Sequence, residues 1–312
     1  MKNCKIFALN SHPALAAEIS RILKMPLGKI TLKKFSCGEN FVNFEETVRG
    51  REIFLIGTAR TEFVNEDFFE VFLAADAAKR SFAKKVHIVF PHFGYARQDK
   101  IHCARESISA KLIAKLLQNS GVDHLICLHL HTDQIQGFFD FTVDNLSARR
   151  LFVEKLKKEK IENPVIVSPD AGGAKSAKKF ADELGANLAI LHKSRPAHNT
   201  AEIFEIVGDV KNRNCILLDD LIDTAGSVCA AKEILIKNGA RKNVFLAATH
   251  PVFSGAARKK LAGAKFAKIF VSDSLPLENC KNLPIETVSV APLISQTIEN
   301  VLSDRSVSQL FF

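Results

Sequence analysis

The sequence lacks the features that would attach the chain to a membrane. None of its apolar runs approaches the roughly 18 residues that a bilayer-spanning helix needs. Residues 1–10 include Lys2 and Lys5, but neither a long apolar core nor a small-residue cleavage site, so we expect no signal peptide. These absences predict a cytoplasmic protein that binds no membrane.

Paired cysteine motifs are also missing. The chain has seven cysteines, an odd number, and no C-x-x-C pair among them. This usage argues against both a disulfide framework and a zinc knuckle. Low-complexity segments and close internal repeats are absent too, which leaves an ordinary globular chain whose cysteines are reduced.

The charge of the chain is strongly positive but is not concentrated in a tail. The net charge is +9, with 43 Lys and Arg residues against 34 Asp and Glu residues. Such a balance favours an anionic partner, either phosphorylated metabolites or nucleic acid. The local basic runs, 155–160 and 241–242, are short, and we interpret them as solvated helix faces rather than a nucleic-acid footprint.

Short apolar runs alternate with amphipathic helical patterns along most of the chain. The stripe Ile108, Leu112, Ile113, Leu116 and Leu117 is typical of a helix packed on a sheet, and Ser107 or Ser109 is the expected N-cap. The expected strands are 5–9, 52–56, 86–90, 125–130, 165–167, 188–191, 216–218, 244–248 and 268–271. This alternation predicts an α/β fold with mainly parallel sheets flanked by helices.

The number of strands is too large for one small sheet, so we expect two domains. Charged helical residues and "IENP" interrupt the strand rhythm between Asp144 and Asn163. We place the division there, with residues 1–145 in the first domain and 146–312 in the second.

The stretch "NCILLDDLIDTAGSV" (214–228) carries the clearest chemical signal. Asp219 and Asp220 are expected at the carboxyl end of a buried strand, where ligands of parallel sheets bind. Residues 223–227 then form a turn that leads into a helix, and its amides and hydroxyls suit a phosphate. The acids suit ribose hydroxyls or magnesium, so the stretch describes a sugar-phosphate site. The alternative is an acidic helix cap.

The segment "LLDDLIDTAGS" resembles the ribose-5-phosphate signature that phosphoribosyltransferases share with ribose-phosphate pyrophosphokinases. Six further segments resemble the pyrophosphokinases, in order and from end to end: "PHFGYARQDK", "DQIQGFFD", "VSPDAGG", "THPVFSG", "SVAPLISQTI" and "SVSQLF". The chain is therefore identified as a member of that family. A phosphoribosyltransferase, which would consume phosphoribosyl pyrophosphate, is the less favoured alternative.

The resemblance implies two phosphoribosyltransferase-like domains, an ATP side followed by a ribose 5-phosphate side, with the final helix packing back on the first domain. It implies transfer of the diphosphoryl group of ATP to the C1 hydroxyl of ribose 5-phosphate, which gives phosphoribosyl pyrophosphate and AMP. The implied cofactor is Mg²⁺, with Mn²⁺ as a second candidate. Hexamers of dimers, activated or inhibited by phosphate and ADP, are also implied, with Arg49, Ser306 and Ser308 in the matching effector segments.

Specific roles follow from the matched positions. Asp219, Asp220, Asp223, Thr224, Ala225, Gly226 and Ser227 would bind ribose 5-phosphate. Lys193 would be the catalytic lysine and Arg195 would hold the substrate and the charge of the transition state. These cations are two residues apart, so an extended segment points both the same way; the alternative is an exposed basic loop.

His131 and Asp170 match the metal-associated positions of the family, although a lone histidine is more often packed or solvated. For ATP, "FSCGE" supplies Phe35, Cys37, Gly38 and Glu39 in a loop that reaches a neighbouring subunit's site. Arg97 and Gln98 are the other matching nucleotide contacts. Phe35 could equally be a core residue. "GGAKS" (172–176) lacks the adjacent Gly-Lys of a P-loop and is expected to open a turn before a helix.

Four positions depart from the family's pattern. Cys37 and His129 stand where aspartates are usual, and Ile101 and Cys103 replace expected cations. We expected His129 and His131 to share one strand face, where two imidazoles would suit a softer metal such as manganese. These departures leave a second hypothesis open: an attenuated or non-catalytic paralogue that assembles with an active synthetase and regulates it.

Overall fold

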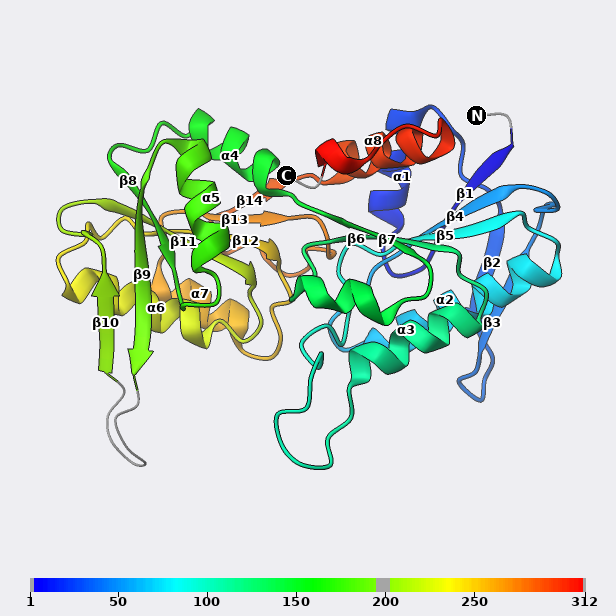
Figure 1. The fold of residues 1–312 in the computed structure, drawn as a ribbon, viewed down its shortest axis with the longest axis horizontal. Coiled ribbons are helices and arrows are strands. Elements are labelled where there is room, and N and C mark those ends of the chain that lie inside the picture. The colour runs from blue at the N-terminus through cyan, green and yellow to red at the C-terminus, as the bar shows by residue number, and fades with distance from the viewer. Residues whose placement is uncertain (1–2, 195–202, 311–312) are drawn as a thin grey trace. The chain divides into compact units, whose positions relative to one another are not determined.

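Strands and helices alternate along the chain, and they form two units with a parallel sheet in each (Figure 1). This computed structural model describes residues 3–194 and 203–310. The first unit comprises Met1–Ala148, Ser274–Pro276 and Val290–Phe312, and the second comprises Arg149–Asp273 and Leu277–Ser289. The α/β class is confirmed. The division of the sequence between residues 145 and 146 stays a prediction.

The first unit is built on a five-stranded parallel sheet of order β1-β4-β5-β6-β7. Its strands are β1 (Cys4–Ala8), β4 (Glu52–Ile56), β5 (Lys85–Val89), β6 (His124–Leu128) and β7 (Thr142–Leu146). Its helices are α1 (Pro13–Leu23), α2 (Val64–Arg80), α3 (Ser109–Asn119) and α8 (Ala291–Leu302), with short 3-10 turns at Asp133–Phe138 and Ser308–Leu310. A hairpin of β2 (Ile30–Lys34) and β3 (Asn40–Phe44) packs beside α2.

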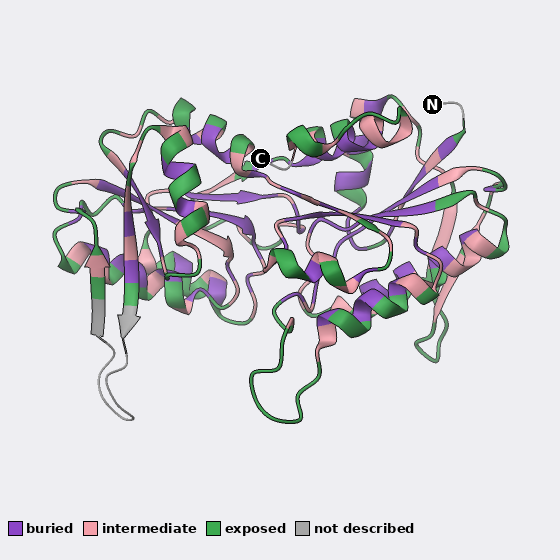
Figure 2. Ribbon diagram, viewed as in Figure 1, coloured by how far each residue is buried: buried purple, intermediate pink, exposed green. Residues whose placement is uncertain are grey.

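Helices cover both faces of this sheet, as buried runs on adjacent parallel strands require. Helices α2 and α3 share one apolar core with the sheet, while α1 and α8 pack together on the opposite side (Figures 1 and 2). The strands are buried while the outer faces of the helices are exposed (Figure 2). Both faces of the sheet therefore contribute to the core, and its strand ends remain available for a site.

The second unit has a seven-stranded sheet of order β10-β9-β8-β11-β12-β13-β14, parallel except for the edge strand β10. The strands are β8 (Pro164–Ser168), β9 (Asn187–Ser194), β10 (Ile203–Val207), β11 (Asn214–Leu221), β12 (Phe245–His250), β13 (Ile269–Ser272) and β14 (Ile285–Val288). Helices α4 (Arg149–Lys158) and α5 (Ala174–Leu184) lie on one face, and α6 (Gly226–Lys237) and α7 (Ala257–Ala264) on the other (Figure 1).

Nine strands were predicted, and β2, β3, β7, β10 and β14 were missed. All five belong to the hairpin or lie at sheet edges. Strands β2 and β3 contain no fully buried residue, β7 and β14 are buried only in part, and no continuous apolar run marks any of the five. The predicted serine cap of α3 is wrong. Ile108 occupies the N-cap without a side-chain bond, and the hydroxyls of Ser107 and Ser109 bond each other.

The helices in the described part of the chain are all too short or too polar to cross a membrane.

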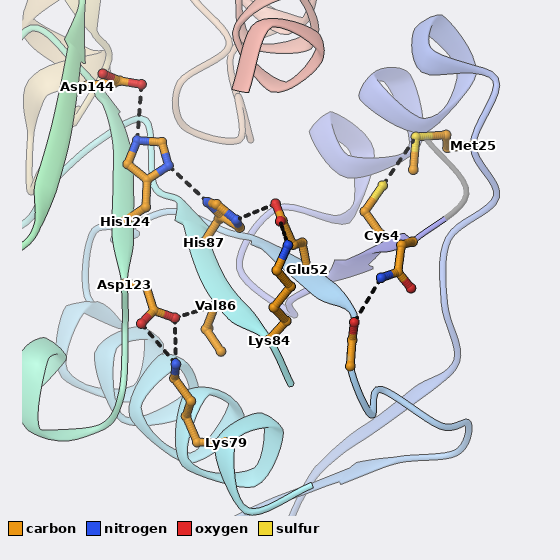
Figure 3. Close-up of polar contacts among 12 residues, drawn as sticks. Cys4, Met25, Glu52, Lys79, Lys84, Val86, His87, Asp123, His124 and Asp144 are labelled. Atoms are coloured by element: carbon orange, nitrogen blue, oxygen red, sulfur yellow. Dashed lines mark hydrogen bonds and ion pairs between the residues drawn. The ribbon is translucent and has the colours of Figure 1, made fainter. Parts of the chain in front are cut away.

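A row of polar side chains, half-buried on β4 and buried on β5, β6 and β7, runs across these four strands (Figure 3). The two Nδ1 atoms of His87 and His124 lie 3.0 Å apart, and His124 Nε2 lies 3.0 Å from Asp144 Oδ2. At the other end, His87 Nε2 lies 3.4 Å from Glu52 Oε2. Burial, reinforced by His124 and opposed by Glu52, lowers the pKa of His87 to about 4. His87 is therefore neutral in the folded protein at neutral pH.

This depressed pKa predicts acid sensitivity of the first unit. His87 takes up a proton near pH 6.5 in the unfolded chain but only near pH 4 in the folded chain. The free energy of unfolding should therefore decrease as the pH falls from 6.5 to 4. His87 should contribute on the order of 3 kcal/mol to the loss. His87→Phe is expected to lose less unfolding free energy than the parent between pH 6.5 and pH 4 in denaturant titrations. The exposed control His102→Phe should keep the parental dependence of the unfolding free energy on pH. An equal pH dependence in all three proteins would contradict the prediction.

Candidate active site

The acids of the sugar-phosphate stretch lie at the carboxyl end of β11. The strand continues through Leu221 rather than ending at residue 218, so Asp219 and Asp220 belong to its last residues and are half-buried. The Asp220 N–H donates to Asp219 Oδ1 at 2.9 Å, and the Leu221 N–H donates to Asp220 Oδ1 at 2.8 Å. These local bonds fix the direction of both carboxyl groups.

Burial, reinforced by the neighbouring Asp220 and to a smaller extent by Asp170, raises the pKa of Asp219 to about 8. The structure therefore brings Asp170, at the end of β8, into the same electrostatic environment as the β11 acids. A half-buried acid surrounded by acids favours a bound cation or hydroxyl donors. Both are what a metal-bound sugar phosphate would supply.

The turn after β11 has a left-handed backbone at its centre. Ala225 is buried and holds a left-handed backbone with φ of 60°, and α6 begins at the next residue, Gly226. A non-glycine residue in this region is strained, and such strain concentrates at functional sites. The Ser254 hydroxyl donates to Asp223 Oδ1, which ties the turn to the segment after β12. Thr224 and Ser227 remain exposed at the amino end of α6.

Lys260 is a candidate phosphate contact that the sequence analysis missed. It lies on α7, and its Nζ is 3.9 Å from the position that a Cβ on Gly226 would occupy. An ammonium beside the positive end of a helix gains nothing from that helix, but the two together favour an anion. The position follows from the packing of α6 on α7, and no spacing in the sequence reveals it.

Asp170 lies in a turn that its neighbours define. Its Oδ1 accepts the Gly173 N–H at 2.9 Å, and its carbonyl accepts the Ser168 hydroxyl at 2.7 Å. A Cβ on Gly173 would lie 2.8 Å from Ser168 Oγ, so glycine permits this close approach. Helix α5 begins at Ala174, which confirms that "GGAKS" opens a turn before a helix.

The catalytic cations are described only in part. The backbone of Lys193 belongs to β9, opposite Phe204 of β10. Arg195 lies outside the described residues. Their shared direction and their roles stay predictions.

In the first unit, the histidines follow β6 but do not share a strand face. Strand β6 ends at Leu128, and His129 adopts a φ of 47°, which turns the chain away from the extended path. The expectation of one strand face is therefore wrong. His129 is half-buried and its N–H donates to Leu146 O at 3.0 Å, whereas His131 is exposed.

The predicted nucleotide contacts lie on exposed segments of the first unit. Phe35, Cys37, Gly38 and Glu39 form the tip of the β2–β3 hairpin. Phe35 is 48 % exposed and contacts the ring of Phe41, so the alternative of a core phenylalanine is wrong. Arg97 and Gln98 are exposed at the start of the long loop before α3. Their binding of a nucleotide stays a prediction.

The predicted effector residues are exposed as well. The Arg49 guanidinium lies 4.7 Å from the ring centre of Phe82, and the hydroxyls of Ser306 and Ser308 are 2.8 Å apart. An exposed arginine and a hydroxyl pair are groups that bind anions.

No three His, Cys, Asp or Glu side chains converge as a ready-made cation site within residues 3–194 and 203–310. Proteins commonly hold magnesium through one or two carboxylates together with water and substrate phosphates. Asp170 and Asp219 offer such carboxylates in the second unit, and their mutual charge would be offset by a cation.

Comparison with known proteins decides the family. Residues 4–121 match the N-terminal domain of ribose phosphate pyrophosphokinase, and residues 196–312 match the phosphoribosyl synthetase-associated domain. The chain belongs to the ribose-phosphate pyrophosphokinase family. The ribose-phosphate pyrophosphokinase of Bacillus subtilis is 43% identical over 311 residues, which cover 99% of this chain and 98% of that protein. The Wolinella succinogenes protein of the same name is 41% identical and is covered completely, as is this chain.

The fold agrees with this membership. The crystal structure of phosphoribosylpyrophosphate synthetase from Mycobacterium smegmatis superposes with a TM-score of 0.91 at 39% identity, covering 97% of this chain and 99% of that one. The expected phosphoribosyltransferase-like α/β architecture of a pyrophosphokinase is thereby confirmed.

Proposed function

We propose that this chain transfers the diphosphoryl group of ATP to the C1 hydroxyl of ribose 5-phosphate, forming phosphoribosyl pyrophosphate and AMP for nucleotide biosynthesis in the cytoplasm. The observation that carries the proposal is the β11 site, where two half-buried acids adjoin a strained turn at the amino end of α6. Full-length similarity to the pyrophosphokinases supports the same reaction.

In this reaction the C1 hydroxyl oxygen attacks the β-phosphorus of ATP, the bond from that phosphorus to the α-phosphate oxygen breaks, and AMP leaves. Asp219, Asp220 and Asp223 accept hydrogen bonds from ribose hydroxyls, while the amides and hydroxyls of Thr224–Ser227 hold the 5-phosphate. This grip orients the C1 hydroxyl for in-line attack. Lys193 and Arg195 offset the charge on the transferred group.

On the ATP side, Phe35, Cys37, Gly38 and Glu39 receive the adenine, and Arg97 and Gln98 contact the nucleotide. His131 of the first unit and Asp170 of the second are each assigned to divalent-cation binding, with His129 as a further candidate near His131 in sequence. When bound, Mg²⁺ or Mn²⁺ would neutralise the charge of the phosphates.

The reaction is tested with purified protein, ATP, ribose 5-phosphate and either Mg²⁺ or Mn²⁺. AMP should form in a one-to-one ratio with phosphoribosyl pyrophosphate. Binding of both substrates without turnover under either metal would instead favour the non-catalytic regulatory paralogue, whose motivation is Cys37, His129, Ile101 and Cys103.

We further propose that the chain forms a homo-oligomer, a hexamer built from dimers. This oligomer responds to phosphate and ADP through Arg49, Ser306 and Ser308. Their exposed guanidinium and hydroxyl groups support an anion site. Sedimentation gives the oligomer, and an activity that does not change with phosphate concentration would contradict the effector site.

Lys260→Met is expected to raise the KM for ribose 5-phosphate about 10-fold, because a charge-assisted contact to the 5-phosphate is lost. The KM for ATP should not change, since the nucleotide contacts lie elsewhere. Lys259→Met, an exposed neighbour on the same helix, is the matched control. Steady-state kinetics with each substrate varied in turn measures both constants, and equal values for the two variants would remove Lys260 from the site.

A further inference from the structure

The segment after β6 is anchored by a side chain from the neighbouring strand β7. The amide of Asn145 makes two bonds of opposite kind: its Oδ1 accepts the Leu130 N–H at 2.9 Å, and its Nδ2 donates to Asp133 Oδ1 at 3.1 Å. Only a carboxamide supplies an acceptor and a donor at this length. Asn145 therefore fixes residues on either side of His131.

A second bond joins this segment to the start of the long loop before α3. The hydroxyl of Thr132 donates to Asp99 Oδ2 at 2.8 Å. Asp99 is half-buried and directly follows Gln98. Gln98 is held as well, because its Oε1 accepts the Ser109 hydroxyl at 2.6 Å. The loop beyond Asp99 is exposed through residue 107, so the Thr132–Asp99 bond lies at its start.

His131 and Gln98 are thus each one residue away from a single hydrogen bond. His131 is exposed, while its neighbours Leu130 and Thr132 are tied to β7 and to Asp99. The Thr132–Asp99 bond connects two segments, and each of them carries an exposed candidate contact next to the bond. Here it sets the distance between them.

We infer that Asn145, Thr132 and Asp99 are positioning residues, which hold His131 in a fixed place relative to the nucleotide segment Arg97–Gln98. The inference rests on the proposed function, because it assigns these residues to the ATP side of that reaction. They need not touch substrate. Small displacements of groups that orient substrates reduce turnover about 100-fold, so loss of either anchor should be visible in kinetics.

The first test breaks the bond between residues 145 and 133 and then restores it in the reverse direction. In Asn145→Asp, two carboxylates face each other where a donor met an acceptor, so the segment should shift. We expect the KM for ATP to rise about 10-fold and kcat to fall about 10-fold, with an unchanged KM for ribose 5-phosphate. Adding Asp133→Asn restores a donor on the opposite side and should recover most of the loss.

The second test removes the Thr132–Asp99 bond. Thr132→Val keeps the shape of the side chain but not the hydroxyl. It should also raise the KM for ATP and lower kcat without changing the KM for ribose 5-phosphate, whereas Thr132→Ser should retain the parental constants. Thr142→Val, the same change at an exposed position of β7, is the control. Thermal unfolding of every variant reports whether it is folded.

The outcomes separate this inference from the function beneath it. An inactive parent protein contradicts the proposed function and the inference together. With an active parent, unchanged ATP constants in Asn145→Asp and Thr132→Val overturn the inference alone. So does an equal rise in the KM of both substrates. The inference is also overturned if adding Asp133→Asn to Asn145→Asp restores no activity and Thr132→Ser loses as much activity as Thr132→Val, because this pattern indicates a general loss of structure.

Discussion

Lys193→Ala protein is expected to form phosphoribosyl pyrophosphate roughly 1000-fold more slowly than the parent, because a cation that offsets transition-state charge is removed. The proposed substrate contacts are the β11 turn and the nucleotide segments rather than Lys193, so both KM values should change little. Arg195→Ala should add a higher KM for ribose 5-phosphate, since Arg195 is assigned to substrate as well as to the transition state.

The measurement is kcat and KM for each substrate, with product detected by coupling to a phosphoribosyltransferase. Lys237→Ala, an exposed lysine at the end of α6, is the control for loss of one positive charge. Lys193→Arg should not restore full activity, because a planar guanidinium cannot replace a compact ammonium at a fixed distance. Parental kcat in Lys193→Ala would remove this lysine from the chemistry.

Asp219→Asn is expected to raise the free energy of unfolding of the ligand-free protein and to lower its catalytic activity. The pKa of Asp219 is raised to about 8, so the folded chain keeps a proton that the unfolded chain releases near pH 3.8. The folded state is therefore progressively destabilised as pH rises from about 4 to about 8, and the full cost persists above that window. Asparagine has no such proton, and near pH 8 the gain should be on the order of 3 kcal/mol.

Activity should change in the opposite direction. A carboxylate that accepts ribose hydroxyls is replaced by a neutral amide, which should lower kcat/KM for ribose 5-phosphate about 100-fold. Denaturant titrations at pH 5 and pH 8 measure the stability, and Glu233→Gln, an exposed acid on α6, is the control. A stability difference that does not grow with pH would contradict the raised pKa of Asp219.

The β11 site was predictable because its parts are contiguous in sequence. The acids, the turn and the start of α6 all fall within residues 219–227, and the strand pattern alone placed the acids at the carboxyl end of a buried strand. Lys260 and Asn145 were not predictable in this way, because each reaches its partners across the packing of separate elements.

The first unit shows a second limit of sequence patterns. A face shared by His129 and His131 follows from strand alternation, but alternation fails where the strand stops, and the φ of His129 marks that stop. The hairpin that carries Phe35 was missed because β2 and β3 contain no fully buried residue and so show no buried run. The α/β class and the positions of the buried strands along the chain were predictable because burial itself generates their apolar runs.

The order of segments along the chain has a consequence for synthesis. The first unit takes its α8 from residues translated after nearly all of the second unit, and Ile294 and Ile298 of that helix are fully buried. A nascent chain that has emerged only as far as Ala148 therefore has no α8 to pack on α1. The ribosome must release almost the whole polypeptide before the amino-terminal half can complete its hydrophobic interior, and a stop codon before residue 291 would harm the half that was made first.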